Sequence, residues 1–532
     1  MDSAMLLIPL LLAVSSVFSQ NPLQYGTISV NSSAGVITGM KQYTTVYGNA
    51  APVKCFFGIP YAEPPTGARR FSRPVAKAPF KDVYDATSVD RPICYQNMEL
   101  LQGNPGPIYN QTEDCLLLNI YAPLHATPSI KRAVMIWIHG GGWVVGSSRQ
   151  WDGSFIASYG DVVVVTLNYR LGPLGYLGTE DSVVQVNGGL FDQLLAIKWV
   201  KANIGAFGGD ADAITIFGVS AGGFDTSLQC ISPLSAGAGL FKRCIPQSGA
   251  AIFTTPNHIP FTRTPLKNAQ TLAATLSCTT DNTVDMVECL RTRSVDEIQK
   301  AASTLLLDGR PVNFQPVIDG DFLPESPLDL FSNPNMEAFK RFKSIDLMIG
   351  STSGDGDVGL GNFRYLVQQG RVPENFTITK EQFVELLQWW LGDISSDVIT
   401  NVDEVLQATL NEYLPLVDID LLEARDILID MLSDLMFIGP AIATAQTHER
   451  MATGAKTFMY FLSYTNGQYA MSSSRRERTA HGADTLYLFN IPSEENWDLA
   501  NISIPFYIEV TPSDRELAKA MITYWTNFAK YG

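Results

Sequence analysis

A serine between two glycines offers the clearest chemistry in this 532-residue sequence. Ser220 lies in Gly218-Val219-Ser220-Ala221-Gly222, where the flanking glycines allow a sharp backbone turn without a side-chain clash. Residues 213–217 are apolar and β-branched, which predicts a buried strand, and residues 221–230 predict a helix. A strand–turn–helix of this kind exposes the hydroxyl at a helix N-terminus and predicts a nucleophile, although a Gly/Ser turn without chemistry has the same pattern.

A serine hydroxyl becomes a good nucleophile only beside a base, which is usually histidine. The sequence has five histidines: His125, His139, His258, His448 and His481. We favour His481, because it follows a charged loop and a predicted strand in a segment able to reach the serine. His125 and His258 lie in proline-flanked loops, His448 is expected on a helix surface, and His139 adjoins a glycine-rich loop.

A carboxylate must orient the histidine, and it is expected between the serine and the histidine in the sequence. Asp355 and Asp357 both follow the apolar strand predicted at residues 345–349. Either aspartate qualifies by its position. The alternative is that this Gly/Asp-rich stretch is only a solvated turn.

A third feature is the run His139-Gly140-Gly141-Gly142-Trp143, which directly follows the apolar strand predicted at residues 134–138. Consecutive glycines leave their N–H groups free to face a ligand oxygen. A glycine loop at the carboxyl end of a buried strand is a typical ligand site in α/β sheets, so we predict an anion-stabilising loop rather than a flexible turn.

The elements needed to position these residues alternate between strands and helices. Further strands are predicted at residues 27–30, 35–38, 55–59, 162–167, 243–247 and 457–461, and helices at 189–204, 264–276, 380–391, 402–413, 421–436 and 512–529. This order predicts an α/β fold with a large, mostly parallel sheet, helices on both faces and a helical cap region. No repeat or linker divides the chain, so residues 20–532 are expected to form a single domain.

The N-terminus and the charge suggest where the protein works. Residues 1–19 fit a signal peptide, with an apolar run over residues 5–17 and a small-residue cleavage site, so we expect a secreted protein. No other stretch is long and apolar enough to predict a transmembrane segment in the mature chain. The formal net charge of −16 argues against a nucleic-acid partner. Glycosylation sequons occur at Asn31, Asn110, Asn375 and Asn501.

The seven cysteines show no metal-binding spacing, so no metal site is predicted. An oxidising compartment favours two local disulfides, Cys94–Cys115 and Cys278–Cys289, each closing a modest loop. Cys55, Cys230 and Cys244 lie in apolar contexts and are interpreted as buried thiols.

From about residue 25 onward the sequence resembles the type-B carboxylesterase/lipase family of α/β-hydrolases, which includes the cholinesterases. The resemblance is carried in one order by the segments 113–119, 139–143, 168–172, 187–193, 217–223, 247–249, 316–320 and 481–482. It implies an α/β-hydrolase fold with Ser220 as nucleophile, His481 as base and Asp355 as acid. Gly141, Gly142 and Ala221 would form the oxyanion hole.

The same resemblance implies that Ser248 lies near these three residues and that both local disulfides form. It also implies buried ion pairs Arg70–Glu113 and Arg170–Asp192. No cofactor is implied, and the oligomeric state is not indicated.

Two departures from the family pattern bear on the substrate. Val219 replaces the usual glutamate before the nucleophile, and the Cys94–Cys115 loop lacks the tryptophan with which cholinesterases hold a choline cation. We therefore expect a secreted serine carboxylesterase that acts on small-molecule or lipid esters, neutral and mainly apolar. A cholinesterase and a non-catalytic adhesion protein of the same fold are the alternatives.

Overall fold

The structure is a computed structural model, and it describes most of the chain. The described residues are 24–46, 49–96, 109–253, 264–307, 310–312, 314–327, 329, 337–362, 370, 379–394, 402–413, 421–465, 476–490 and 510–532. The predicted signal peptide, His258, Asn375 and Asn501 lie outside them.

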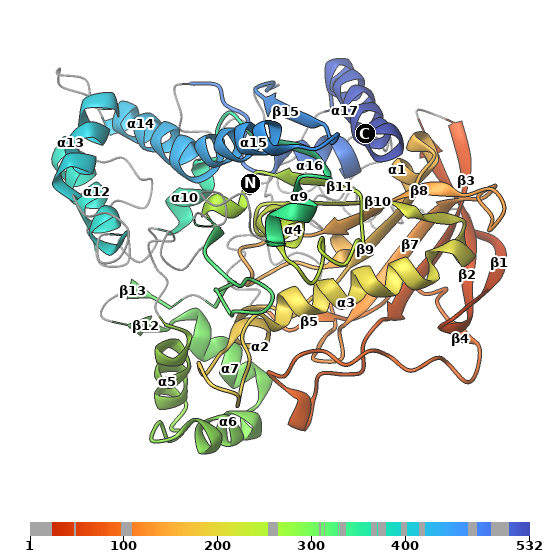
Figure 1. The fold of residues 1–532 in the computed structure, drawn as a ribbon, viewed down its shortest axis with the longest axis horizontal. Coiled ribbons are helices and arrows are strands. Elements are labelled where there is room, and N and C mark those ends of the chain that lie inside the picture. The colour runs from red at the N-terminus through yellow and green to blue at the C-terminus, as the bar shows by residue number, and fades with distance from the viewer. Residues whose placement is uncertain are drawn as a thin grey trace, which may run out of the picture.

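Within the described residues, one eleven-stranded sheet forms the centre of the molecule (Figure 1). Its strands are β1 (Gln24–Ser32), β2 (Gly35–Val46), β3 (Asn49–Pro60), β4 (Tyr84–Asp85), β7 (Leu117–Pro123), β8 (Arg132–Ile138), β9 (Val163–Leu167), β10 (Gly209–Val219), β11 (Arg243–Gln247), β14 (Asp346–Thr352) and β15 (Thr457–Leu462). The order is β1-β2-β3-β7-β9-β8-β10-β11-β14-β15, with β4 beside β2.

The sheet is mixed. Strands β9, β8, β10, β11, β14 and β15 pair in parallel, and β1, β2, β3 and β7 form antiparallel pairs that end against β9. The hairpin predicted at residues 27–38 is the β1–β2 pair.

Successive side chains of β8 point to opposite faces of the sheet, and from Val134 to Ile138 both sets are apolar, so both faces must be covered. Val134, Ile136 and Ile138 join the core beneath α3 (Gly188–Asn203) and α4 (Ala221–Ile231). Met135 and Trp137 join the opposite core with α1 (Ser154–Gly160) and α17 (Pro512–Tyr531). The predicted α/β class, with helices on both faces of a large sheet, is confirmed.

The remaining helices lie mainly beyond the strand ends (Figure 1). They are α2 (Gly172–Tyr176), α5 (Pro265–Thr275), α6 (Thr283–Thr292), α7 (Val295–Ser303), α9 (Glu337–Phe342), α10 (Asp357–Asn362), α12 (Lys380–Ile394), α13 (Val402–Tyr413), α14 (Leu421–Ser433), α15 (Gly439–Met451) and α16 (Ala483–Thr485). Two short strand pairs complete the fold: β5 (Ile93–Cys94) with β6 (Gln111–Thr112), and β12 (Leu306–Leu307) with β13 (Arg310–Pro311).

A π-helical segment, Asp434–Ile438, joins α14 to α15, so the helix predicted at residues 421–436 continues further than expected. By length and composition alone, the helical run Arg425–Met451 could span a membrane, but half of its most apolar window is buried inside the protein. Buried core helices pass the same test, so this run is weak evidence for a membrane span.

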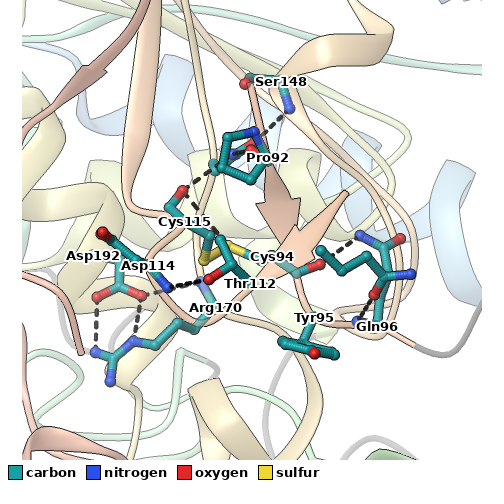
Figure 2. The surroundings of a disulfide bond; sticks show 12 residues. Pro92, Cys94, Tyr95, Gln96, Thr112, Asp114, Cys115, Ser148, Arg170 and Asp192 are labelled. Carbon is teal, nitrogen blue, oxygen red and sulfur yellow. Dashed lines mark hydrogen bonds and ion pairs between the residues drawn. A yellow bond between two sulfur atoms is a disulfide. The ribbon is translucent and has the colours of Figure 1, made fainter. Parts of the chain in front are cut away.

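The structure contains the two predicted disulfides, Cys94–Cys115, which Figure 2 shows, and Cys278–Cys289. It also pairs Cys230 with Cys244, so our interpretation of these two as thiols was wrong. They meet because Cys230 lies on α4 and Cys244 on β11, which pack against each other. Cys55 is a buried free cysteine, as expected.

Both expected ion pairs are present. Arg70 binds Glu113 through two hydrogen bonds of 2.6 and 2.7 Å. Arg170 binds both oxygens of Asp192 at 2.8 Å, and Asp192 is fully buried. Arg170 and the Cys94–Cys115 disulfide line the same small cavity. Figure 2 shows both groups.

The prediction that His448 lies on a helix surface was wrong. Its imidazole is fully buried at the end of α15, against β14 and β15. Nδ1 lies 2.7 Å from the Thr457 hydroxyl, and Nε2 lies 2.9 Å from the carbonyl of Ile345. These partners come from other segments, so the charged residues that follow His448 in the sequence gave no sign of them.

Replacing Asp192 with asparagine is expected to destabilise the protein by about 3–5 kcal/mol, because it leaves the Arg170 guanidinium buried without a counter-charge. The midpoint of urea unfolding measures this loss. Asp90→Asn is the control: Asp90 is 81% exposed in its pair with Arg149, and its loss should cost at most about 1 kcal/mol. Equal midpoints for the two variants would contradict the prediction.

Candidate functional site

Ser220 occupies the sharp turn between β10 and α4. Its backbone has φ 56° and ψ −127°, an unusual conformation for a residue with a side chain. Such strain costs roughly 1–3 kcal/mol and persists only where the surroundings fix it. Here the Ser220 N–H donates to the carbonyl of Gln247 at 2.9 Å, and the Ser220 carbonyl accepts from Phe224 N at 2.8 Å.

The glycines around Ser220 are required by close backbone approach. A Cβ on Gly222 would lie 2.1 Å from the carbonyl oxygen of Ile138, and one on Gly218 would lie 2.5 Å from the same atom. These contacts press the turn against the end of β8. The elbow predicted from the sequence is therefore formed, with Ser220 part-buried at the start of α4.

His481 and Asp355 meet directly. The Nδ1 atom of His481 lies 2.8 Å from Oδ1 of Asp355, and the Asp355 carboxylate is fully buried. Its other oxygen accepts from the Ser248 hydroxyl at 2.9 Å and from the Thr352 N–H at 2.8 Å. Asp355 Oδ1 bonds Nδ1 of the imidazole and holds the ring proton there. Nε2 of His481 is therefore the nitrogen that can accept a proton.

His481 Nε2 is buried and has no hydrogen-bond partner among the described residues. The next residue, Gly482, faces Val219, since a Cβ there would lie 4.0 Å from the Val219 side chain. The histidine loop thus adjoins the residue before Ser220. The Phe437 ring packs against the imidazole, with 5.0 Å between their centres.

Burial alone would lower the pKa of His481, but the hydrogen bond and charge of Asp355 raise it, and the net shift is upward. Asp357, the other candidate acid, meets His481 at its backbone N–H, at 3.3 Å, rather than at its ring. Burial raises the pKa of Asp357 to about 7. The geometry therefore favours Asp355 as the partner of the imidazole ring.

Gln247 connects the serine turn to the histidine loop. Its carbonyl holds the N–H of Ser220, and its side-chain amide donates to Asp484 at 2.8 Å. Asp484 lies three residues after His481, is fully buried, and also accepts from the Tyr460 hydroxyl at 2.7 Å. Asp484 was not among the residues predicted for the site; the signal for it was its spacing of three residues from His481 across a short helical turn.

The glycine loop lies beside the serine. A Cβ on Gly140 would lie 3.0 Å from the Cβ of Ser220. Gly141 and Gly142 have positive φ values of 114° and 62°. Among the described residues, no acceptor is bonded to the N–H of Gly141, Gly142 or Ala221, so these three groups are available to an oxygen atom of a ligand.

His139 shapes this loop rather than titrating in it. Its Nδ1 lies 2.9 Å from the carbonyl of Gly140, and its ring stacks on Tyr169 at 4.4 Å. Burial lowers the pKa of His139 to about 4, so the ring is neutral at ordinary pH. His125 is exposed and pairs with Asp161.

The described residues contain no cluster of three histidine, cysteine or acidic side chains able to hold a metal ion. Asn31 and Asn110 are exposed, which leaves both sequons accessible.

Comparison with known proteins identifies relatives along nearly the whole chain. Residues 26–532 match the model of the carboxylesterase family. Carboxylesterase 3 of Pongo abelii is 32% identical over 94% of this chain and 83% of its own length. Carboxylesterase 5A of Canis lupus familiaris is 32% identical over 92% of this chain and 79% of its own.

Neuroligin-2 of Mus musculus is 33% identical over 94% of this chain. The chain spans only 60% of the length of that relative. The carboxylesterases and the neuroligin are thus about equally similar to this chain.

Asp355→Asn is expected to lower the pKa of His481, because it removes the negative charge that stabilises the imidazolium and leaves the opposing effect of burial. NMR titration of histidine-labelled protein measures it, and a His481→Gln variant assigns the signal among five histidines. Asp357→Asn is the matched control and should lower the pKa less, since Asp357 does not bond the ring. A larger shift for Asp357→Asn would reverse the assignment of the two carboxylates.

Proposed function

Because this chain belongs to the carboxylesterase family, we propose that it hydrolyses carboxylic esters through a covalent acyl-enzyme on Ser220. The observation that carries the proposal is the bond between Asp355 and His481 Nδ1, next to a serine held in a strained turn. The triad logic requires this arrangement: a carboxylate that orients the histidine, and a histidine that activates the serine.

In the first half-reaction, the Ser220 Oγ attacks the ester carbonyl carbon while His481 Nε2 takes its proton. Asp355 keeps the ring proton on Nδ1 and stabilises the imidazolium that forms. His481 then gives its proton to the leaving alcohol, and the C–O bond of the ester breaks. Water repeats the sequence on the acyl-enzyme, releasing the acid and restoring Ser220.

The negative oxygen of each tetrahedral intermediate would be held by the N–H groups of Gly141, Gly142 and Ala221. That no acceptor in the described part of the chain is bonded to them supports this role. Ala221 is also the first residue of α4, whose N-terminal dipole favours negative charge. A single donor of this kind contributes about 3 kcal/mol to transition-state stabilisation.

The substrate class is best described as neutral, mainly apolar esters. Val219 is buried next to Ser220 and supplies no negative charge. Three aromatic rings lie in a row beside His481. The centre of the Phe437 ring is 6.1 Å from that of Phe224, and the Phe224 ring centre is 5.9 Å from that of Trp143. Because aromatic faces can also bind a cation, it is the missing negative charge at position 219, not the rings, that favours an uncharged substrate over a quaternary ammonium ester.

Three disulfides support export to an oxidising compartment, since such bonds rarely persist in the cytosol. Together with the expected signal peptide at residues 1–19, they are the basis for proposing a secreted enzyme. The similarity to Neuroligin-2 is the reason to test catalysis directly, because the family alone does not fix the activity.

Ser220→Ala should reduce hydrolysis of p-nitrophenyl esters by more than about 10⁴-fold and abolish labelling by a fluorophosphonate, because both reactions need the Oγ atom. Ser227→Ala, on the same helix, is the control and should retain activity. Wild-type protein that neither turns over esters nor takes the label would favour the non-catalytic alternative.

The charge preference can be tested with acetylthiocholine and its neutral isostere, 3,3-dimethylbutyl thioacetate. The wild type should have a kcat/KM for the neutral ester at least equal to that for the cationic one, since Val219 offers no counter-charge. Val219→Glu should raise the ratio in favour of the cation. A wild type that prefers acetylthiocholine tenfold or more would instead indicate a cholinesterase.

A further inference from the structure

The helix that begins at Ser220 carries a buried carboxylate one turn later. Asp225 lies on α4, is fully buried, and accepts hydrogen bonds only from neutral donors among the described residues. Trp143 Nε1 donates to Oδ1 at 2.8 Å, and Gln193 Nε2 donates to Oδ2 at 2.5 Å. Burying a carboxylate is costly, so its position here requires an explanation.

One partner of Asp225 belongs to the glycine loop. Trp143 directly follows Gly142, and its backbone has φ 61°, a left-handed conformation that costs a bulky residue roughly 1–2 kcal/mol. Its carbonyl accepts from the Gly172 N–H at 2.7 Å, and its ring packs on Phe224. Trp143 is therefore held both at its backbone carbonyl and at its ring nitrogen, and these two bonds keep the strained loop in place.

The other partner fixes the carboxylate itself. Gln193 lies on α3, and its Oε1 atom accepts from Gln229 on α4 at 3.3 Å. Gln193 and Gln229 are both fully buried. The Asp225 side chain is thus locked between two helices before it meets the indole, so it can act as a rigid anchor.

We propose that Asp225 is a positioning residue that holds the two halves of the oxyanion hole in register by binding the Trp143 indole to α4. Gly141 and Gly142 lie on the loop that ends in Trp143, and Ala221 lies on the helix that carries Asp225. The Trp143–Asp225 bond joins these two segments directly. This inference rests on the proposed ester hydrolysis, because alignment of the three N–H groups matters only if an oxyanion forms.

Trp143→Phe tests the proposal, because it removes the indole N–H and keeps an aromatic ring. It should lower kcat about 10–100-fold with little change in KM, since a displacement near 1 Å can cost that much. Affinity for a trifluoromethyl ketone, which forms a tetrahedral adduct on the serine, should fall by a similar factor. Rates are divided by active sites titrated with a fluorophosphonate, so loss of folded protein does not mimic the effect.

Two further variants separate positioning from simple packing. Asp225→Ala should reproduce the kcat loss, whereas Asp225→Asn should retain more activity than Asp225→Ala, because its oxygen can still accept from the Trp143 indole. Trp151→Phe is the matched control. Trp151 is as buried as Trp143, but its Nε1 has no partner among the described residues, so kcat should not change.

The inference is overturned if Trp143→Phe or Asp225→Ala keeps wild-type kcat and inhibitor affinity, or loses no more than Trp151→Phe. An active wild type with unaffected variants contradicts this inference alone. A wild type that hydrolyses no ester contradicts the proposed function, and this inference falls with it.

Discussion

The parallel register of four neighbouring strands is the constraint on which the site depends. Ile138 at the end of β8 pairs with Gly218 of β10, while Val219 pairs with Gln247 of β11, and Gln247 pairs with Gly350 of β14. The four strands therefore end at one edge. A shift of one residue in any pair would turn the following loop and every side chain of that strand to the other face.

From that edge the chain continues into the glycine loop, the Ser220 turn, Ser248 and the loop of Asp355. The backbone joins them again beyond the strands: the Ser220 N–H reaches across to β11, and the Ser248 N–H donates to the Gly350 carbonyl at 2.8 Å. Ser220, Ser248 and Asp355 thus follow their strands within three residues. This is the usual way in which an α/β sheet presents a site on loops without losing its geometry.

Much of this arrangement could be predicted from the sequence, because its signals are local. The strand over residues 134–138 is apolar throughout, as a strand buried on both faces must be, and the observed β8 ends at the expected residue. The helix predicted at residues 189–204 begins and ends within one residue of α3. The pattern of Gly218 and Gly222 around Ser220 specifies a turn whose steric reason lies within a few residues.

The errors have a common cause, which is that a polar residue is buried according to what other segments bring to it. His448 has exposed charged neighbours in sequence, but its acceptors come from residues up to 106 positions away. Cys230 and Cys244 gave no pairing signal until α4 packed on β11. Trp143 and Asp225 are 82 residues apart, so neither residue type alone predicted their bond.

Three buried carboxylates have different roles because different partners, distant in the sequence, contact each of them. Asp192 on α3 is neutralised by Arg170, which lies between β9 and α2, whereas Asp355 receives a hydroxyl, an N–H and an imidazole. Asp225 has neither cation nor imidazole, and burial raises its pKa to about 7. Within the described part of the chain, only two neutral donors offset the cost of burying the Asp225 carboxylate. Losing either hydrogen bond would leave a polar atom buried without a partner, so both donors are held firmly in position.

The same argument explains why the site tolerates strain. Ser220 and Trp143 both have positive φ values. Backbone hydrogen bonds with Gln247 and Phe224 hold Ser220, and the Gly172 N–H together with the Asp225 carboxylate holds Trp143. Strained residues relax unless several independent contacts oppose the change. The contacts that oppose it here are the same ones that bring the three free N–H groups together. Stability and alignment of the site therefore depend on one set of interactions, and weakening them is expected to affect geometry before it affects the fold.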